Sequence, residues 1–155
     1  MRFRDIKKQK NKKQKEKTLT DVKYATFTDR IKALITDLFM IYIPILYIIT
    51  YLVLDGKDEF QSSQLAPLVA VSLYGLVYAL LVSKFGQTPG KKAYLIKIVD
   101  SKTQENISFI RAFYRFTAFL LSATSLLGLL LPLFRADKKA LHDIMANTAV
   151  IAINE

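Results

Sequence analysis

The sequence predicts an all-α membrane protein with three hydrophobic helical segments and a small cytoplasmic β element. Of the 155 residues, 52% are hydrophobic, and the charged residues are gathered between long apolar runs. Soluble domains interleave these two kinds of residue at helix or strand period, so the segregation indicates membrane helices. The apolar runs are Ile31 to Leu54, Leu65 to Ser83 and Phe116 to Phe134. Each is near the roughly 20 residues that cross the hydrocarbon.

The first apolar run carries a carboxylate, Asp37, where a charge costs about 2.5–3.5 kcal/mol on insertion scales. Arg30 precedes it by two helical turns and lies on the same face of the helix. We therefore expect Arg30 to offset the charge of Asp37, which makes this pair the first candidate functional site. Pro44 lies later in the same run and is expected to kink the helix.

The charges of the connecting segments predict the side of the membrane on which each lies. Residues 54–64 contain three acidic residues and one lysine and are expected outside. Residues 84–115 carry seven Lys or Arg against two acidic residues and are expected inside. In the second run, Ser72, Gly75 and Ala79 form a stripe at helical spacing. The stripe is either a contact surface for another helix or ordinary lipid-facing sequence.

Two short segments have the composition of strands. Tyr94 to Val99 and Thr148 to Ile153 are rich in β-branched residues, and the second is too short to span a membrane. A lone strand leaves backbone groups unpaired, so we expect these two to pair on one side of the membrane.

The third apolar run has two possible paths. A single crossing would separate the two strands and place the basic residues after it outside. A hairpin or re-entrant element over residues 108–134, turning near Ser122 to Ser125, would return the chain inside. The charge rule and backbone pairing both favour the return.

The amino-terminal segment is strongly basic, with nine Lys or Arg in the first 17 residues and a formal net charge of +10 for the whole chain. Such a block before a span predicts that residues 1–25 form a disordered cytoplasmic tail that anionic lipids attract. No recognisable nucleic-acid-binding motif accompanies the basic segment, so nucleic acid is not an expected partner.

Composition also limits the chemistry. Cysteine is absent and there is a single histidine, His142. These counts exclude disulfides and thiolate catalysis and leave too few ligands for a zinc centre, so no metal or cofactor is expected. Neither a nucleophile–base pair nor a metal cluster can be assembled, and we do not expect an enzyme.

Three groups of residues occur in order: one in the first apolar run, one in the turn after the second run, and one near the carboxyl end. They are Arg30, Ala33 and Asp37; Gly86, Thr88, Gly90 and Lys91; and Leu141, His142, Asp143, Thr148, Ala149 and Val150. In identity and spacing these groups resemble the motifs of the RDD family of bacterial membrane proteins, named for one arginine and two aspartates.

The resemblance implies a multi-pass domain over residues 26–153 in the bacterial cytoplasmic (inner) membrane, and the charge rule places the amino terminus in the cytoplasm. It implies a central site of Arg30, Asp37 and Asp143. The accessory residues that it implies are His142, Gly86, Thr88, Gly90 and Lys91. Lys91 and Lys92 are expected to face lipid phosphates. Some RDD-type proteins are associated with cation/proton antiport, so the resemblance also implies a link to that class.

Two functions stay open. In the first, a buried Asp37 exchanges a proton for a monovalent cation, in a small transporter or transporter subunit that works as a homo-oligomer. In the second, Arg30, Asp37 and Asp143 form ion pairs whose role is only structural: they hold the first apolar helix against the carboxyl-terminal segment. The protein would then be a non-transporting accessory or assembly protein that binds a partner or anionic lipid.

Overall fold

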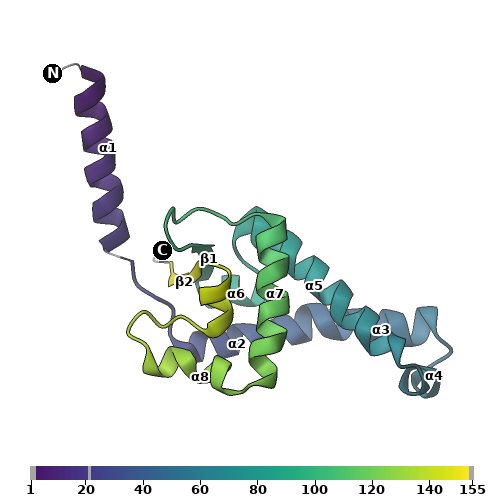
Figure 1. The fold of residues 1–155 in the computed structure, drawn as a ribbon. Helices are drawn as coiled ribbons and strands as arrows, with labels where there is room; N and C mark the ends of the chain where they lie inside the picture. The colour runs from purple at the N-terminus through teal and green to yellow at the C-terminus, as the bar shows by residue number, and fades with distance from the viewer. Residues whose placement is uncertain (1–2, 21, 154–155) are drawn as a thin grey trace.

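The computed structural model describes residues 3–20 and 22–153, which form a mostly helical protein with one two-stranded sheet. Residues 27–85 form a long apolar hairpin of helices, which we call the arm. Residues 86–153 form a group of short helices and strands with one longer helix, which we call the cap. The arm runs away from the cap (Figure 1).

The first half of the arm is a continuous helical run from Phe27 to Val53, long and apolar enough to cross a membrane. Its parts are α2 (Phe27–Asp37), the π-helical turn η1 (Leu38–Tyr42), α3 (Ile43–Ile48) and the π-helical turn η2 (Ile49–Val53). Thr26 caps its start, because the Thr26 hydroxyl accepts a hydrogen bond from the N–H of Asp29 at 3.2 Å.

The run passes through Pro44 as one helix. The π turn η1 precedes the proline, and the N–H of Ile43 bonds to the carbonyl of Leu38, five residues back. A π turn inserts one extra residue and so rotates the residues that follow it relative to those before. This turn begins directly after Asp37, so the helix is irregular next to the buried carboxylate.

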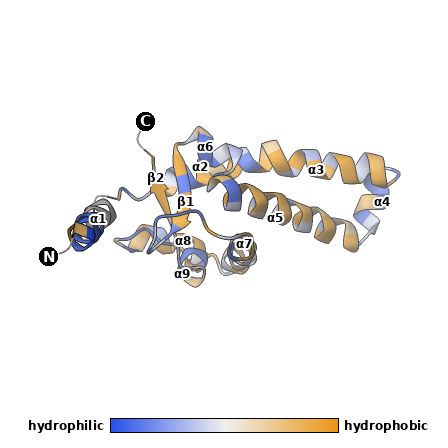
Figure 2. Ribbon diagram, turned by 90° about the horizontal axis from the view of Figure 1, so that it is seen from above, coloured by the Kyte–Doolittle hydropathy of each residue, from blue (hydrophilic) through white to orange (hydrophobic). Residues whose placement is uncertain are grey.

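The second half of the arm returns beside the first. A short helix, α4 (Lys57–Ser62), leads into α5 (Leu65–Phe85), the second helix that is long and apolar enough to span a membrane. Figure 2 shows the two halves side by side, mostly hydrophobic and joined at α4. The rings of Tyr42 and Tyr74 meet edge to face between them, with centroids 5.8 Å apart.

The stripe of small residues on α5 is largely a contact surface for another helix. Gly75 and Ala79 are buried, whereas Ser72 is exposed. A Cβ on Gly75 would overlap the ring of Phe116, which lies on α7 (Phe109–Thr124). The stripe therefore lets the cap approach α5 closely, as small residues do between membrane helices.

The two predicted strands pair, which confirms that expectation. Strands β1 (Ile96–Asp100) and β2 (Thr148–Ala152) are antiparallel, with Ile98 opposite Val150. The residues just before α2 extend this sheet, since the N–H of Ala25 donates to the carbonyl of Val150 at 2.9 Å. The sheet thus ties β2 to the segment that leads into α2.

The third apolar region is a bent pair of helices. α7 and α8 (Leu127–Phe134) meet at an angle of 97°, at the turn expected near Ser122 to Ser125. A short helix, α9 (Leu141–Met145), then leads into β2. Because Asp100 of β1 lies opposite Thr148 of β2, both ends of the region between the strands lie at the sheet.

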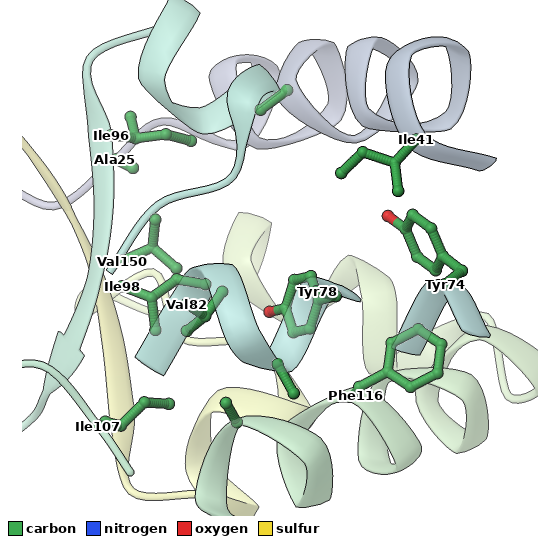
Figure 3. Packing of buried hydrophobic residues seen from close by; sticks show 13 residues of the cluster. Ala25, Ile41, Tyr74, Tyr78, Val82, Ile96, Ile98, Ile107, Phe116 and Val150 are labelled. Atoms are coloured by element: carbon green, nitrogen blue, oxygen red, sulfur yellow. The ribbon is translucent and has the colours of Figure 1, made fainter. Parts of the chain in front are cut away.

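One apolar core joins the cap to the arm. Ile98 and Val150 of the sheet pack with Val82 of α5, and the core continues through Tyr78 to Phe116 (Figure 3). A five-residue helix, α6 (Pro89–Ala93), connects the end of α5 to the sheet and lies against α2.

The basic segment differs from the expected disordered tail. Helix α1 (Phe3–Thr20) is rich in Lys, which favours helix, and its residues 3–13 are exposed. It stands apart from the arm and the cap (Figure 1). Residues 1, 2 and 21 of the predicted tail lie outside the described residues.

The strand register is testable because the chain has no cysteine. Lys97 and Ile151 lie directly opposite each other, so the double variant Lys97→Cys with Ile151→Cys is expected to form a disulfide under mild oxidation. The matched control is Lys97→Cys with Val150→Cys, whose side chains point to opposite faces. Mass spectrometry of proteolytic fragments detects the bond, and a bond in the control alone would show a register shifted by one residue.

Candidate functional site

Asp37, the last residue of α2, is fully buried and has three partners in the turn that begins α6. Its Oδ2 accepts a hydrogen bond from the hydroxyl of Thr88 at 2.5 Å, and its Oδ1 accepts one from the N–H of Gly90 at 2.8 Å. The Nζ of Lys91 lies 3.5 Å from Oδ2. We call this group the Asp37 centre.

The turn sequence explains how the Asp37 centre is built. Gly86 ends α5 in the left-handed conformation at φ +68°, which glycine adopts without strain. Thr88 then caps α6, and its hydroxyl accepts a hydrogen bond from the N–H of Lys91 at 3.4 Å. A Cβ on Gly90 would overlap the carbonyl oxygen of Ala33, so only glycine allows α6 to lie this close to α2.

Lys91 turns inward, whereas the exposed neighbour Lys92 does not. The Lys91 side chain is 12% exposed, and its Nζ lies 5.3 Å from the ring centroid of Tyr78. Burial lowers the pKa of Lys91, although the charge of Asp37 acts in the opposite direction. The expectation that Lys91 faces lipid phosphates is therefore wrong. The counter-charge of Lys91 is the buried carboxylate of Asp37 and not a phosphate at the membrane surface.

Asp143 forms a second centre with two arginines. This residue of α9 is fully buried, and its Oδ2 accepts a hydrogen bond from Nη1 of Arg30 at 2.6 Å. Its Oδ1 is paired with Nη1 of Arg115, and the N–H of Ala140 donates to Oδ2 at 3.0 Å. Burial alone would raise the pKa of Asp143, but the charges of Arg115 and Arg30 outweigh it and hold this pKa below its ordinary value.

Arg115 was not identified from the sequence as a site residue. It lies on α7, where Nε donates to the hydroxyl of Tyr78 at 3.2 Å and Nη1 donates to the hydroxyl of Thr148 at 3.0 Å. A signal was present, since a charged residue among the apolar residues of a membrane-associated helix usually has a buried partner. The two centres thus bring together α2, α5, α6, α7, α9 and β2.

The expected pair between Arg30 and Asp37 is not formed in the described part of the chain; each has a different partner. Two turns of helix separate them by about 10 Å along the axis, which is too far for a direct contact. Arg30 instead reaches Asp143, and Asp37 is satisfied by α6. Of the two aspartates of the expected site, Asp143 is therefore the one that pairs with Arg30.

His142 is a buried neutral residue beside the second centre. Its ring meets that of Phe119 edge to face, with centroids 5.3 Å apart, and its Nε2 lies 3.7 Å from Oδ1 of Asp143. Burial, followed by the charge of Arg115, lowers the pKa of His142 to about 3. Over residues 3–20 and 22–153, no three His, Asp or Glu side chains gather closely enough to hold a metal ion.

A cavity of about 110 Å³ lies between the two centres. The polar side chains that line it include Lys91 of the Asp37 centre and both arginines of the Asp143 centre. Each centre therefore presents cationic side chains to one shared space.

The close contact at Gly90 gives a direct test. Gly90→Ala is expected to lower the free energy of unfolding by about 1–3 kcal/mol, because the new methyl group must push α6 away from α2. Thermal unfolding in detergent measures the loss. Lys92→Ala, an exposed change on the same helix, is the matched control and should stay within about 0.5 kcal/mol of wild type. Equal stability of the two variants would contradict the packing described.

Comparison with known proteins extends this picture. The model of the RDD family matches residues 24–147, which include both centres. The uncharacterised protein YckC of Bacillus subtilis (strain 168) is 32% identical over 136 residues, covering 83% of this chain and 84% of the relative. No solved structure matches the chain significantly.

Proposed function

The chain belongs to the RDD family of membrane proteins, and from this premise we propose that it exchanges a monovalent cation for a proton at the Asp37 centre. The observation that carries the proposal is the pairing of Asp37 with Lys91 rather than with an arginine. A buried lysine can lose its proton near neutral pH, whereas an arginine stays charged. The pair therefore contains a proton that can be released.

The exchange is balanced in charge. When the ammonium of Lys91 releases one proton, the carboxylate of Asp37 loses its counter-charge. One monovalent cation then binds that carboxylate, with the hydroxyl oxygen of Thr88 as a neighbouring ligand. Rebinding of the proton by Lys91 displaces the cation. The lowered pKa of Lys91 favours the step in which the proton leaves.

The Asp143 centre has a positioning role in this scheme. Arg30 and Arg115 stay charged, so their pairs with Asp143 do not take part in proton exchange. They hold α2 and α7 against α9 and so fix the walls of the cavity that Lys91 faces. Two spanning helices enclose little space, so we propose that the route across the membrane lies between the subunits of a homo-oligomer.

The exchange is tested in vesicles that contain the purified protein and a pH-sensitive dye. Under an imposed pH gradient, addition of Na⁺, K⁺ or Li⁺ is expected to cause proton flux. Lys91→Arg keeps the charge but removes the exchangeable proton, and should lower this flux at least about tenfold. The matched control, Lys92→Arg, changes the exposed neighbour and should leave flux unchanged. No cation-dependent flux from wild type, or equal flux from Lys91→Arg, would refute the proposal.

A second candidate function is a non-transporting accessory or assembly role. The observation that favours it is the exposed basic face of α1, which suits anionic lipids or an acidic partner. Both ion-pair centres would then be structural. In that case the wild-type protein shows no flux, and Asp37→Asn lowers the amount of folded protein in the membrane.

We further propose that the cap and α1 lie on the cytoplasmic side of the bacterial inner membrane, while the α4 end of the arm lies outside. The basic residues of the cap and of α1 support this orientation. The bent pair α7–α8 would then enter and leave on the inner side, because both of its ends lie at the sheet.

Cysteine labelling in intact cells tests this topology on the cysteine-free background. A membrane-impermeant thiol reagent is expected to label Ser62→Cys but not Thr103→Cys or Ala136→Cys, all at exposed positions. After the cells are permeabilised, all three should react, which controls for local accessibility. Labelling of Ala136→Cys without Thr103→Cys would show that α7–α8 crosses the membrane.

A further inference from the structure

We propose that Tyr78 of α5 is a positioning residue for the proton exchange, because the face of its ring attracts the ammonium group of Lys91 and so favours the protonated form of this lysine. The inference rests on the exchange proposed above and extends it from the Asp37 centre to a residue of the second span. Tyr78 acts through Lys91 and gives up no proton itself.

The ring of Tyr78 lies beside the charged end of Lys91. The Nζ of Lys91 is over the ring, 5.3 Å from its centroid, and an aromatic face attracts a cation within about 6 Å. Both side chains are shielded from water, since Tyr78 is 8% exposed and the side chain of Lys91 is 12% exposed. Such a contact favours the cation about twofold at an exposed site and about 30-fold or more where both groups are desolvated.

The ring of Tyr78 is held in place on several sides. Its hydroxyl oxygen accepts a hydrogen bond from Nε of Arg115 at 3.2 Å. The ring itself packs with those of Phe116 and Tyr74 in the apolar core, with centroids 5.7 and 6.5 Å away (Figure 3). These contacts fix the orientation of the ring towards Lys91, so the attraction is in place before a proton returns.

Several other groups act on the proton of Lys91. The charged and titratable groups around Lys91 are Asp37 and Arg30 of α2, Arg115 of α7, and His142 and Asp143 of α9. Burial has the largest effect and lowers the pKa of Lys91, Asp37 raises this pKa, and Arg115 lowers it. His142 adds no charge near neutral pH, since its own pKa is about 3. The ring of Tyr78 acts in the same direction as Asp37 and therefore partly offsets burial.

The ring differs from Asp37 in a way that bears on the exchange. In the proposed scheme a cation binds the carboxylate of Asp37, and the charge of that cation weakens the attraction of Asp37 for a proton on Lys91. The ring of Tyr78 has no net charge to be neutralised, so its attraction for an ammonium group remains. We therefore expect the ring to support the return of the proton that displaces the cation.

Fluorination of the ring tests the contact while keeping the shape of the ring. Tyr78→Phe is compared with trifluorophenylalanine in place of Tyr78, because fluorine atoms withdraw negative charge from the ring face. The proton-binding constant of Lys91 is measured by NMR on the full chain in detergent, from the pH titration of the Lys91 side-chain signal, which Lys91→Arg identifies by its loss. The fluorinated ring is expected to lower this constant about 2- to 30-fold relative to Tyr78→Phe.

The controls separate the ring face from other effects. Tyr78→Phe should stay within about threefold of wild type, because its ring still faces Lys91. If Tyr78→Phe does not fold, fluorotyrosine in place of Tyr78 keeps the hydroxyl that Arg115 contacts and is compared with wild type instead. Trifluorophenylalanine in place of Phe116, a ring of the same core, should leave the titration of Lys91 unchanged. Equal proton binding with and without fluorine at position 78, or an equal change from position 116, would overturn the proposal.

The flux assay distinguishes failure of this inference from failure of the exchange. Weaker proton binding by Lys91 moves the midpoint of the pH profile of cation-dependent flux to lower pH, by the factor found in the titration. A purely structural role of Tyr78 would leave that midpoint in place. A shifted titration in a chain that shows no flux supports the action of the ring on Lys91 and counts against the exchange alone. A pH profile that is the same with both rings overturns the positioning role.

Discussion

The carboxylate of Asp143 is the point on which the architecture depends. It lies on a five-residue helix of the cap, yet it accepts bonds from Arg30 of the first span and Arg115 of α7. Loss of this one carboxylate would leave two buried guanidinium groups facing each other, and breaking a buried pair typically costs about 3–5 kcal/mol. The apolar core and the strand pairing also hold these elements together. The contacts of Asp143 in addition neutralise the charges of Arg30 and Arg115.

The two centres differ in the chemistry of their cations. Arginines surround Asp143, so its surroundings keep the same charge at any physiological pH. A lysine, Lys91, faces Asp37, and burial lowers the pKa of this lysine. The fold thus places a centre of constant charge beside one whose charge can change, with a shared cavity between them. In the exchange proposed above, the Asp37 centre reacts while the Asp143 centre keeps the helices in place.

Local patterns in the sequence predicted the helices and strands well, but they did not predict which residues the charged side chains contact. Hydropathy predicted both halves of the arm, and β-branched composition predicted both strands. Their pairing followed from the backbone groups that a lone strand would leave unpaired. The turn from Gly86 to Lys91 was recognised, but its contact with Asp37 was not. Asp37 and Lys91 are 54 residues apart, and Arg30 and Asp143 are 113 apart, so no periodicity relates them. The π turns and the role of Arg115 likewise depend on tertiary packing.

The distance along the chain between Arg30 and its partner has a consequence for biosynthesis. A ribosome releases the first span long before it has translated α9, and β2 follows α9 in the chain. Until then, Arg30 has no access to Asp143, and the edge formed by Ala25 has no strand to join. The nascent protein must therefore wait in a partly assembled form whose charges are shielded by water or lipid head groups. Premature termination of translation would leave that form with no means of completing the fold.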